Sequence, residues 1–213
     1  MAPGFRITAQ DVLLVVDVQN DFCPSGALPV THGDHVIEPI QRIAPLFEHL
    51  ILTQDWHPAN HTSFAANHPG KAPYESIALS YGEQTLWPMH CVQGSHGADL
   101  HPSLNLPQAE LILRKGFHAN IDSYSTFYEN DRVTPTGLAS YLRERGLRRI
   151  FLAGLAYDYC VAFSALDARR LGLPVVVIHD ACRAIDLNGS VARMEAEFEK
   201  TGVQVVETSD LWN

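Results

Sequence analysis

The sequence predicts an α/β fold built on a mostly parallel sheet of six strands. Six short apolar runs rich in β-branched residues recur along the 213 residues, and helical patterns lie between several of them. The runs are apolar on both faces, as strands are when helices cover a parallel sheet from both sides. The recurring runs, their alternation with helices and their two-sided apolar character agree on this fold class.

The first strand is expected at residues 12–18, where "VLLVVDV" is apolar except for Asp17. The later strands are expected at residues 50–53, 111–114, 149–153, 175–179 and 203–207. Helices are expected at residues 35–49, 136–145, 158–171 and 190–200. Gly146, Gly172 and Gly202 follow the last three helices, where glycine commonly caps the C-terminus.

The segment from residue 55 to residue 107 departs from this alternation. It holds many of the histidines, prolines and aromatic residues and shows little periodicity. We expect a long excursion over one end of the sheet, because loops of that length in a compact domain usually serve function.

Length and composition favour one compact domain spanning residues 1–213. The chain is 46% hydrophobic and 18% charged, and it has no long Ser/Gly/Pro tract that would indicate a linker. Its net charge of −9, with no large basic cluster, argues against a nucleic-acid or anionic-membrane partner. The start "MAPGFRITAQ" lacks the apolar core of a signal peptide, and no run approaches the ~18 apolar residues of a membrane span. We therefore expect a cytoplasmic protein without disulfides.

Reactive side chains stand at the expected carboxyl ends of four strands. Asp17 ends the first strand, Asp55 and His57 follow the second, Lys115 follows the third, and "GLAYDYC" leads from the fourth to Cys160. In an open parallel sheet, ligands bind beyond the carboxyl ends of the strands. The sequence therefore predicts that these groups meet on one rim of the sheet.

Cys160 is a candidate nucleophile. It stands near the expected start of a helix, two residues after Asp158, a plausible N-cap, so that backbone amides could stabilise a thiolate. The alternative is a small buried hydrophobe, which most free cysteines are. A thiol with an ordinary pKa near ~8.5 needs a base, and Asp17 could supply it if the first and fourth strands are neighbours.

Asp17 and Lys115 each have a structural alternative. Asp17 could form an Asx-turn with the backbone of the following residues, and Lys115 could be an ordinary surface lysine. A carboxylate and an ammonium that are partly buried each cost several kcal/mol unless they are paired. We expect the two side chains to form such a pair, which would keep Asp17 ionised until a thiol proton arrives.

The stretch "QDWHPANHTSF" indicates a metal site. Asp55 and His57 are two residues apart, so in extended backbone both side chains lie on the same face. Oxygen and nitrogen donors suit zinc, iron or manganese better than calcium or magnesium. A solvated loop histidine remains the alternative for any single member of the set. The third ligand would come from His61, His68, His90 or His96.

Five segments resemble the nicotinamidase/pyrazinamidase family, within the cysteine hydrolases that include isochorismatase-like proteins. They occur in order over about the whole chain: "VVDVQNDFCPSGAL", "QDWHPANHTSF", "WPMHCVQGSHGADLHP", "RKGFHANIDSYSTF" and "LAGLAYDYCV". The resemblance implies the isochorismatase-like hydrolase fold, a three-layer α/β/α arrangement around a six-stranded parallel sheet. It also implies hydrolysis of nicotinamide to nicotinate and ammonia in NAD salvage, and of pyrazinamide to pyrazinoate, by a monomer or a homodimer.

Carried over by motif, the resemblance implies a role for each site residue. The catalytic triad would be Asp17, Lys115 and Cys160. The oxyanion hole would be the amides of Ala156, which follows a cis peptide bond, and Cys160. The ring pocket would be lined by Phe22, Trp87 and Tyr124. One divalent ion, zinc or iron with manganese also possible, would be held by Asp55, His57 and His90, with His61 as a possible further ligand.

Three rival functions remain open from the residues alone. The first is an isochorismatase-like amidase that acts on a different small amide without a metal. The second is a metallohydrolase in which metal-bound water attacks and Cys160 is only structural. The third is a non-catalytic module that binds a small molecule with the same fold.

Overall fold

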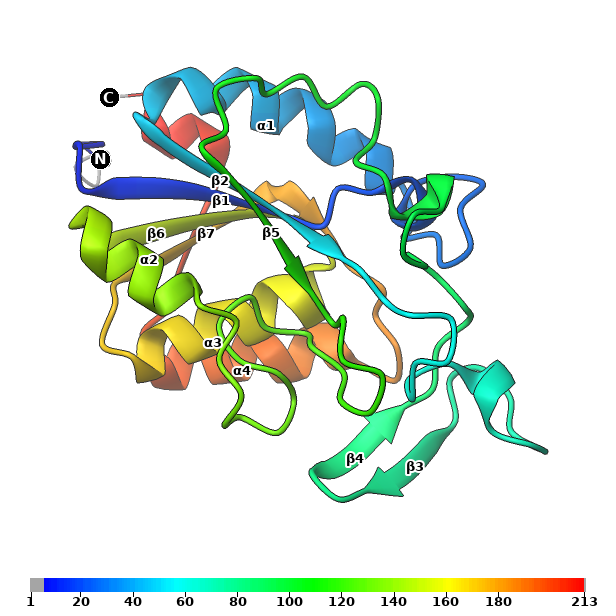
Figure 1. Ribbon diagram of the computed structural model, residues 1–213. Helices are drawn as coiled ribbons and strands as arrows, with labels where there is room; N and C mark the ends of the chain where they lie inside the picture. Colours follow the sequence, from blue (N-terminus) through cyan, green and yellow to red (C-terminus); the bar gives the residue numbers. More distant parts are fainter. Residues whose placement is uncertain (1–5, 213) are drawn as a thin grey trace.

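Six parallel strands form the sheet of the computed structural model, which describes residues 6–212 (Figure 1). The first five residues of the N-terminal stretch considered above lie outside the described part. The strand order is β5-β2-β1-β6-β7-β8. The bounds are Asp11–Val16 for β1, His49–Asp55 for β2, Leu111–Lys115 for β5, Arg149–Leu155 for β6, Val175–Arg183 for β7 and Gln204–Val206 for β8. The predicted fold class and all six predicted strands are confirmed.

Helices cover both faces of the sheet, as the three-layer arrangement requires. The helix α1, Ile37–Ile43, lies over one face together with the C-terminal 3₁₀ turn Thr208–Leu211 (Figure 1). The opposite face is covered by α2, Leu138–Arg145, α3, Ala162–Arg170, and α4, Ser190–Thr201.

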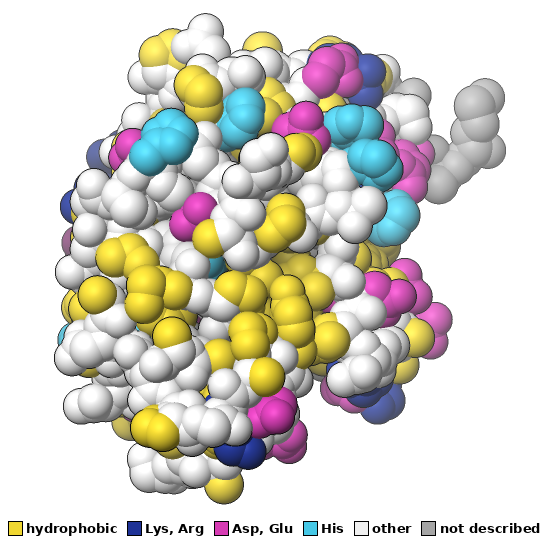
Figure 2. Space-filling model, turned by 90° about the vertical axis from the view of Figure 1, so that its right-hand side faces the viewer, with side chains coloured by type: hydrophobic (Ala, Val, Ile, Leu, Met, Phe, Trp, Pro, Cys, Tyr) yellow, Lys and Arg dark blue, Asp and Glu magenta, His cyan; other side chains and the backbone are white. Residues whose placement is uncertain are grey.

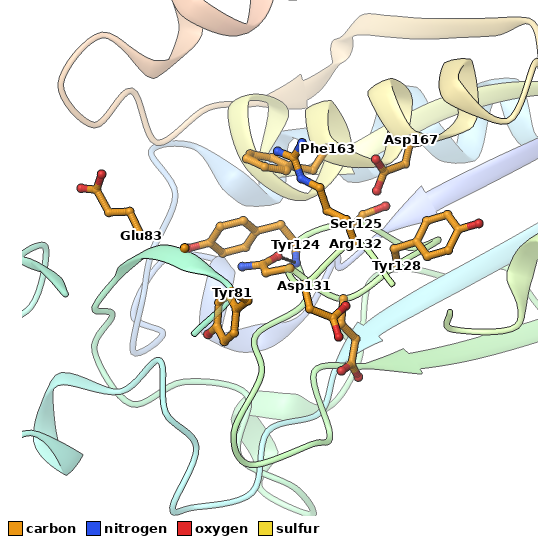
Figure 3. Close-up of a pocket in the computed structure, with 12 residues that line it drawn as sticks. Tyr81, Glu83, Tyr124, Ser125, Tyr128, Asp131, Arg132, Phe163 and Asp167 are labelled. Carbon is orange, nitrogen blue, oxygen red and sulfur yellow. Dashed lines mark hydrogen bonds between the residues drawn. The ribbon is translucent and has the colours of Figure 1, made fainter. Parts of the chain in front are cut away.

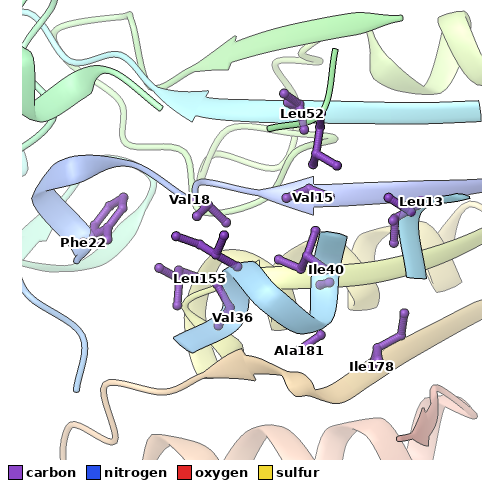
Figure 4. Close-up of a cluster of buried hydrophobic side chains, with 14 of the residues drawn as sticks. Leu13, Val15, Val18, Phe22, Val36, Ile40, Leu52, Leu155, Ile178 and Ala181 are labelled. Atoms are coloured by element: carbon purple, nitrogen blue, oxygen red, sulfur yellow. The ribbon is translucent and has the colours of Figure 1, made fainter. Parts of the chain in front are cut away.

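The core is divided between the two faces of the sheet. In β1, Leu13 and Val15 belong to the hydrophobic cluster under α1, which Figure 4 shows with Ile40 packed against the strands. Their neighbours Val12 and Leu14 belong to the cluster under α2, α3 and α4. Because successive side chains of a strand point to opposite faces, an uninterrupted apolar run is what a two-sided core requires.

The boundaries of three predicted elements need correction. The first strand ends at Val16 and not at residue 18, because Asp17 adopts a left-handed backbone with φ of 48°. The helix predicted at 35–49 is α-helical only over Ile37–Ile43 and continues as the 3₁₀ turn Ala44–Leu46, where Pro45 has no amide hydrogen to donate. The helix predicted at 158–171 becomes α-helical at Ala162, after a π-helical turn at Tyr157–Val161.

The excursion at 55–107 holds a hairpin that the sequence analysis missed. The strands β3, Ser76–Leu79, and β4, Gly82–Thr85, pair antiparallel and project from the body of the molecule (Figure 1). Both strands have four residues and are largely exposed, so they carry little of the apolar alternation that identifies a strand. Within residues 6–212, no helix is long and apolar enough to cross a membrane, and all four cysteines are free and buried.

The strand order places a ligand-binding crevice beside β1. The chain runs from β1 outward to β2 and β5, and then returns to add β6 on the other side of β1. The crossover connections therefore diverge at the carboxyl ends of β1 and β6, which opens a crevice there. At the same place Gly154 has φ of 117°, and a Cβ at this residue would lie 2.1 Å from the Val16 carbonyl oxygen. Only glycine fits this close approach of the two strands.

Candidate active site

The sheet brings the three residues of the predicted triad into contact. Asp17 follows β1, Lys115 is the last residue of β5, and Cys160 lies in the π-helical turn after β6. The Lys115 Nζ lies 2.9 Å from Asp17 Oδ2 and 3.3 Å from Cys160 Sγ. All three side chains are buried. β1 and β6 are neighbours, as the hypothesis of Asp17 as the base for Cys160 requires.

Lys115 is a buried cation held between two carboxylates. Its Nζ donates to Asp55 Oδ1 at 2.5 Å and to the Ser123 carbonyl oxygen at 2.9 Å. Burial alone would lower the pKa of Lys115, but the charges of Asp17 and Asp55 outweigh it and raise this pKa well above its ordinary value. Lys115 therefore stays charged, and the alternative of a surface lysine is wrong.

The two oxygens of Asp17 have different surroundings. Oδ1 accepts a hydrogen bond of 2.5 Å from Thr53 Oγ1. Oδ2 lies 2.9 Å from Lys115 Nζ. Burial raises the pKa of Asp17, against the opposing pull of Lys115. The carboxylate thus contacts Thr53 and Lys115 and forms no Asx-turn, and Oδ2 has a lone pair available for a proton.

The surroundings of Cys160 favour its protonated thiol form. Burial raises the pKa of Cys160 well above its ordinary value, the charge of Lys115 opposes this rise, and the charges of Asp55 and Asp17 add to it. The expected N-cap is also absent, because the Asp158 carboxylate instead accepts from the amides of Ile185 and Asp186 at 2.9 and 2.8 Å. Without that cap, ionisation of Cys160 depends on a neighbouring base.

Three of the predicted metal ligands converge on one point. Asp55 Oδ2 lies 3.6 Å from His57 Nε2 and 3.9 Å from His90 Nε2. The other ring nitrogens are held by backbone, since Nδ1 of His57 bonds to the Gly116 carbonyl and Nδ1 of His90 to the Pro88 carbonyl, each at 2.8 Å. Such second contacts orient histidines that ligate metals. This set of one carboxylate and two imidazoles fits a zinc or iron ion.

A buried glutamine fixes the backbone of Asp55. Gln19 donates through Nε2 to the Asp55 carbonyl at 2.9 Å and accepts through Oε1 from the Asp55 amide at 2.8 Å. This role of Gln19 is not among the predicted ones. It depends on the neighbouring positions of β1 and β2, and a single glutamine in the chain gives no indication of it.

His61 lies beside the group of three ligands. Its ring centroid is 4.2 Å from that of His57. Its Nδ1 bonds to Ser63 Oγ at 2.7 Å and its Nε2 to the Ile121 carbonyl at 3.1 Å. Both ring nitrogens therefore have protein partners in this structure, whereas Nε2 of His57 and Nε2 of His90 face Asp55.

The three predicted ring-pocket residues line one pocket above Cys160. Trp87 Nε1 donates to the Tyr124 hydroxyl at 3.0 Å, and Phe22 stands against His90 with ring centroids 5.4 Å apart. The free space is only about 20 Å³, room for about one water, so the walls must move apart to admit a ring. The peptide bond between Leu155 and Ala156 is cis, as the resemblance implies. The lining is Phe22, Asp55, Trp87, His90, Asp122, Tyr124, Ala156, Tyr159, Cys160 and Ile185.

Three residues of the pocket lining were missed by sequence reasoning: Asp122, Tyr159 and Ile185. Tyr159 precedes Cys160 in "YDYC", and this adjacency could have indicated it. Ile185 lies on the loop after β7, and nothing in the local sequence indicates a pocket residue. Figure 2 shows the right-hand side of Figure 1, where hydrophobic side chains gather across the middle of the face and histidines lie toward its upper part.

Gly116→Ala is expected to weaken metal binding by at least about tenfold. A Cβ at Gly116 would lie 2.4 Å from His57 Cε1 and 2.6 Å from His57 Nδ1, so the imidazole would have to leave its present position beside Asp55. Disturbing the contacts that orient a metal ligand typically costs about 10- to 100-fold in affinity. Titration of metal-free protein with zinc would measure this change.

Gly146→Ala is the matched control for Gly116→Ala. Gly146 has φ of 73° against 66° for Gly116, so the backbone strain is similar, but a Cβ there meets no atom within 4 Å. The control should lose stability without losing metal affinity. Equal zinc affinity in the two variants would contradict the role given to the His57 orientation.

Comparison with known proteins is consistent with this geometry. A family model described as the isochorismatase domain matches residues 11–210. A nicotinamidase from Acinetobacter baylyi is 53% identical over 199 residues, covering 93% of this chain and 93% of that protein.

Two solved structures extend the comparison. A nicotinamidase/pyrazinamidase from Acinetobacter baumanii matches with a TM-score of 0.95 and 53% identity, covering 96% of this chain and 99% of that one. A pyrazinamidase of Pyrococcus horikoshii in complex with zinc matches with a TM-score of 0.73 and 33% identity, covering 93% and 99%. The matched domain and these relatives show that the chain belongs to the isochorismatase family.

Proposed function

We propose that this protein is a metal-assisted cysteine amidohydrolase that converts nicotinamide to nicotinate and ammonia. The observation that carries the proposal is the buried Lys115, whose Nζ contacts both Asp17 and Cys160 at the floor of an aromatic pocket. The similarity to nicotinamidases at 53% identity supports the choice of substrate. Pyrazinamide, which has the same aromatic carboxamide, is the expected second substrate.

The proposed reaction begins with transfer of the Cys160 thiol proton to Asp17 Oδ2. The thiolate attacks the carboxamide carbon, and the amides of Ala156 and Cys160 stabilise the oxyanion. Asp17 then gives its proton to the nitrogen, the C–N bond breaks, and ammonia leaves a thioester on Cys160. A water that loses a proton to Asp17 attacks the thioester, and the proton returns to the sulfur as nicotinate leaves.

Lys115 is the catalytic residue that stabilises negative charge in this scheme. Its charge lowers the energy of ionised Asp17 and of the thiolate, since both lie against the same Nζ. Phe22, Trp87 and Tyr124 would hold the flat ring over the sulfur. Their aromatic faces favour a ligand of the same shape.

Asp55, His57 and His90 would hold the divalent ion, and His61 would support His57 from the side. When bound, the ion would act as a Lewis acid toward the pyridine nitrogen and would orient the substrate. Zinc is the first choice, because the donor set fits it and the pyrazinamidase of Pyrococcus horikoshii was solved with zinc. Iron and manganese remain compatible with the same donors.

Ammonia release from a panel of amides tests the proposal. The panel is nicotinamide, pyrazinamide, benzamide and an aliphatic amide, each with and without a chelator. Nicotinamide and pyrazinamide should be hydrolysed, and chelation should reduce both rates. No ammonia from nicotinamide in zinc-loaded protein would overturn the proposal, and full activity after thiol alkylation would point to attack by metal-bound water.

His57→Ala is expected to lose bound metal first and substrate affinity as a consequence. The side chain supplies one of the three converging donors, and removing it leaves too few ligands for tight binding. Metal content after dialysis and the KM for nicotinamide would measure the two effects. An unchanged metal content would show that the ion binds elsewhere.

A further inference from the structure

A second pocket lies behind Tyr124, on the side away from Cys160. It has a volume of about 270 Å³, and Tyr124 is a wall of both pockets. In Figure 3 it lies between the β3–β4 hairpin, the loop that carries residues 124–132, and α3. Nothing in the proposed reaction uses this space.

Aromatic side chains provide much of the wall. Tyr81 from the hairpin, Tyr128 from the loop and Phe163 from α3 line the pocket with Tyr124 (Figure 3). The Tyr81 hydroxyl donates to Gln84 Oε1 at 3.0 Å, so its polar group is occupied and its ring remains for a ligand. Aromatic rings around a cavity favour a cation, because their faces carry partial negative charge.

Glu129 is the group in this pocket whose bonding is incomplete. It lines the cavity, and its side chain is only 4% exposed. Oε1 is paired with His118 Nδ1 at 2.6 Å, whereas Oε2 is buried and has no hydrogen-bond partner in residues 6–212. A buried carboxylate oxygen without a donor is costly, and a cationic ligand would remove that cost.

Two of the other carboxylates of the lining are bonded within the protein, and the third, Glu83, is exposed. Asp131 accepts from the amides of Val133 and Thr134, each at 2.9 Å. Asp167 pairs with Arg170 at 2.5 Å. Glu129 is therefore the buried carboxylate of the lining that keeps an oxygen without a partner, and these neighbours strengthen the negative potential around it.

We propose that this pocket binds a small organic cation, an ammonium or a pyridinium, with its charge at Glu129 and its apolar part against Tyr81, Tyr124 and Phe163. The volume suits a small ligand of about ten non-hydrogen atoms. The proposal rests on the cavity and not on the reaction at Cys160, so it can be tested without turnover.

Arg132 carries a positive charge that opposes binding of a cation, and this gives a second test of the proposal. It is the one cationic side chain of the lining, and it is exposed. A bound organic cation is repelled by this guanidinium and attracted by Glu129. Removing the two charges must therefore shift affinity in opposite directions.

Binding of choline and 1-methylpyridinium to the zinc-loaded enzyme tests the proposal, with 3,3-dimethylbutan-1-ol as the uncharged counterpart of choline. At least one cation should bind, and the alcohol should bind at least about tenfold more weakly than choline, because it lacks the charge. Titration calorimetry or ligand-observed NMR gives the affinities. Failure of both cations to bind, or equal binding of the alcohol, would overturn the proposal.

Two variants assign the binding to this pocket. Glu129→Gln keeps the shape of the side chain. It should lower the affinity for the cation by about tenfold, since a charged hydrogen-bond partner is replaced by a neutral one. Arg132→Gln should strengthen it. Tyr81→Leu should also lower the affinity for the cation, and it replaces Glu129→Gln as the test if that variant folds poorly. Glu38→Gln, an exposed change on α1, is the control and should leave the affinity unchanged. If substitutions at residues 129 and 132 leave the affinity unchanged, the cation binds elsewhere. If ammonium binds as tightly as the organic cations, the proposed contact of the ligand's apolar part with the aromatic rings is wrong.

Discussion

Replacing Cys160 with alanine is expected to abolish release of ammonia from nicotinamide, by about 10⁴-fold or more, as loss of a covalent nucleophile does. The Cys160 sulfur lies 3.3 Å from Lys115 Nζ and is the only thiol among the groups that contact this ammonium in residues 6–212. No other group on the rim can form the acyl intermediate, because Asp17 and Asp55 are held as ion-pair partners of Lys115. Single-turnover and steady-state assays of ammonia release would measure the loss.

The Cys160→Ala variant should keep its metal and bind nicotinamide with little change. The sulfur is not among Asp55, His57 and His90, and the aromatic walls remain. Metal content and calorimetry with nicotinamide would separate loss of chemistry from loss of the site. Cys182→Ala is the matched control, because Cys182 is also a buried free thiol but lies in β7, outside the ring pocket. Appreciable turnover by the Cys160 variant would exclude the thiol mechanism.

The fold could be predicted because its strands are buried on both faces. An apolar run such as Val12 to Val16 carries the two-sided core in its own composition, whereas β3 and β4 carry almost none of it. Element ends were less predictable. The left-handed backbone at Asp17 and the π-helical turn before α3 follow from contacts across the sheet rather than from the local sequence.

The part of the candidate site that could be predicted consists of reactive side chains at or just beyond the carboxyl ends of strands. Asp17, Lys115 and Cys160 stand there by topology alone. Three features could not be predicted in this way. They are the hydrogen bond from Thr53 to Asp17, the two hydrogen bonds between Gln19 and the backbone of Asp55, and the unpaired oxygen of Glu129. Each depends on packing between segments far apart in the chain, for example 36 positions between Asp17 and Thr53.

Lys115→Met is expected to lower the free energy of unfolding by about 3–5 kcal/mol, as breaking a buried ion pair does. Methionine has a similar length, so little packing is lost. What remains is Asp17 and Asp55, both buried, without the ammonium that lies 2.9 and 2.5 Å from them. Urea unfolding, with a chelator present so that no metal neutralises Asp55, would measure the loss. Lys200→Met removes an exposed pair with Glu197 and should change stability by less than about 1 kcal/mol.

A second variant and a change of pH test the cause of that loss. In Asp17→Asn/Lys115→Met one of the two unpaired charges is gone, so part of the stability should return, and the single effects should not add. Burial already raises the pKa of Asp17 against the pull of Lys115, and loss of the lysine must raise it further. The folded variant then binds a proton at a pH where the unfolded chain has released it, so the deficit should shrink as pH falls from 8 toward 5. A deficit that is independent of pH and is not reduced by Asp17→Asn would assign the loss to packing instead of charge.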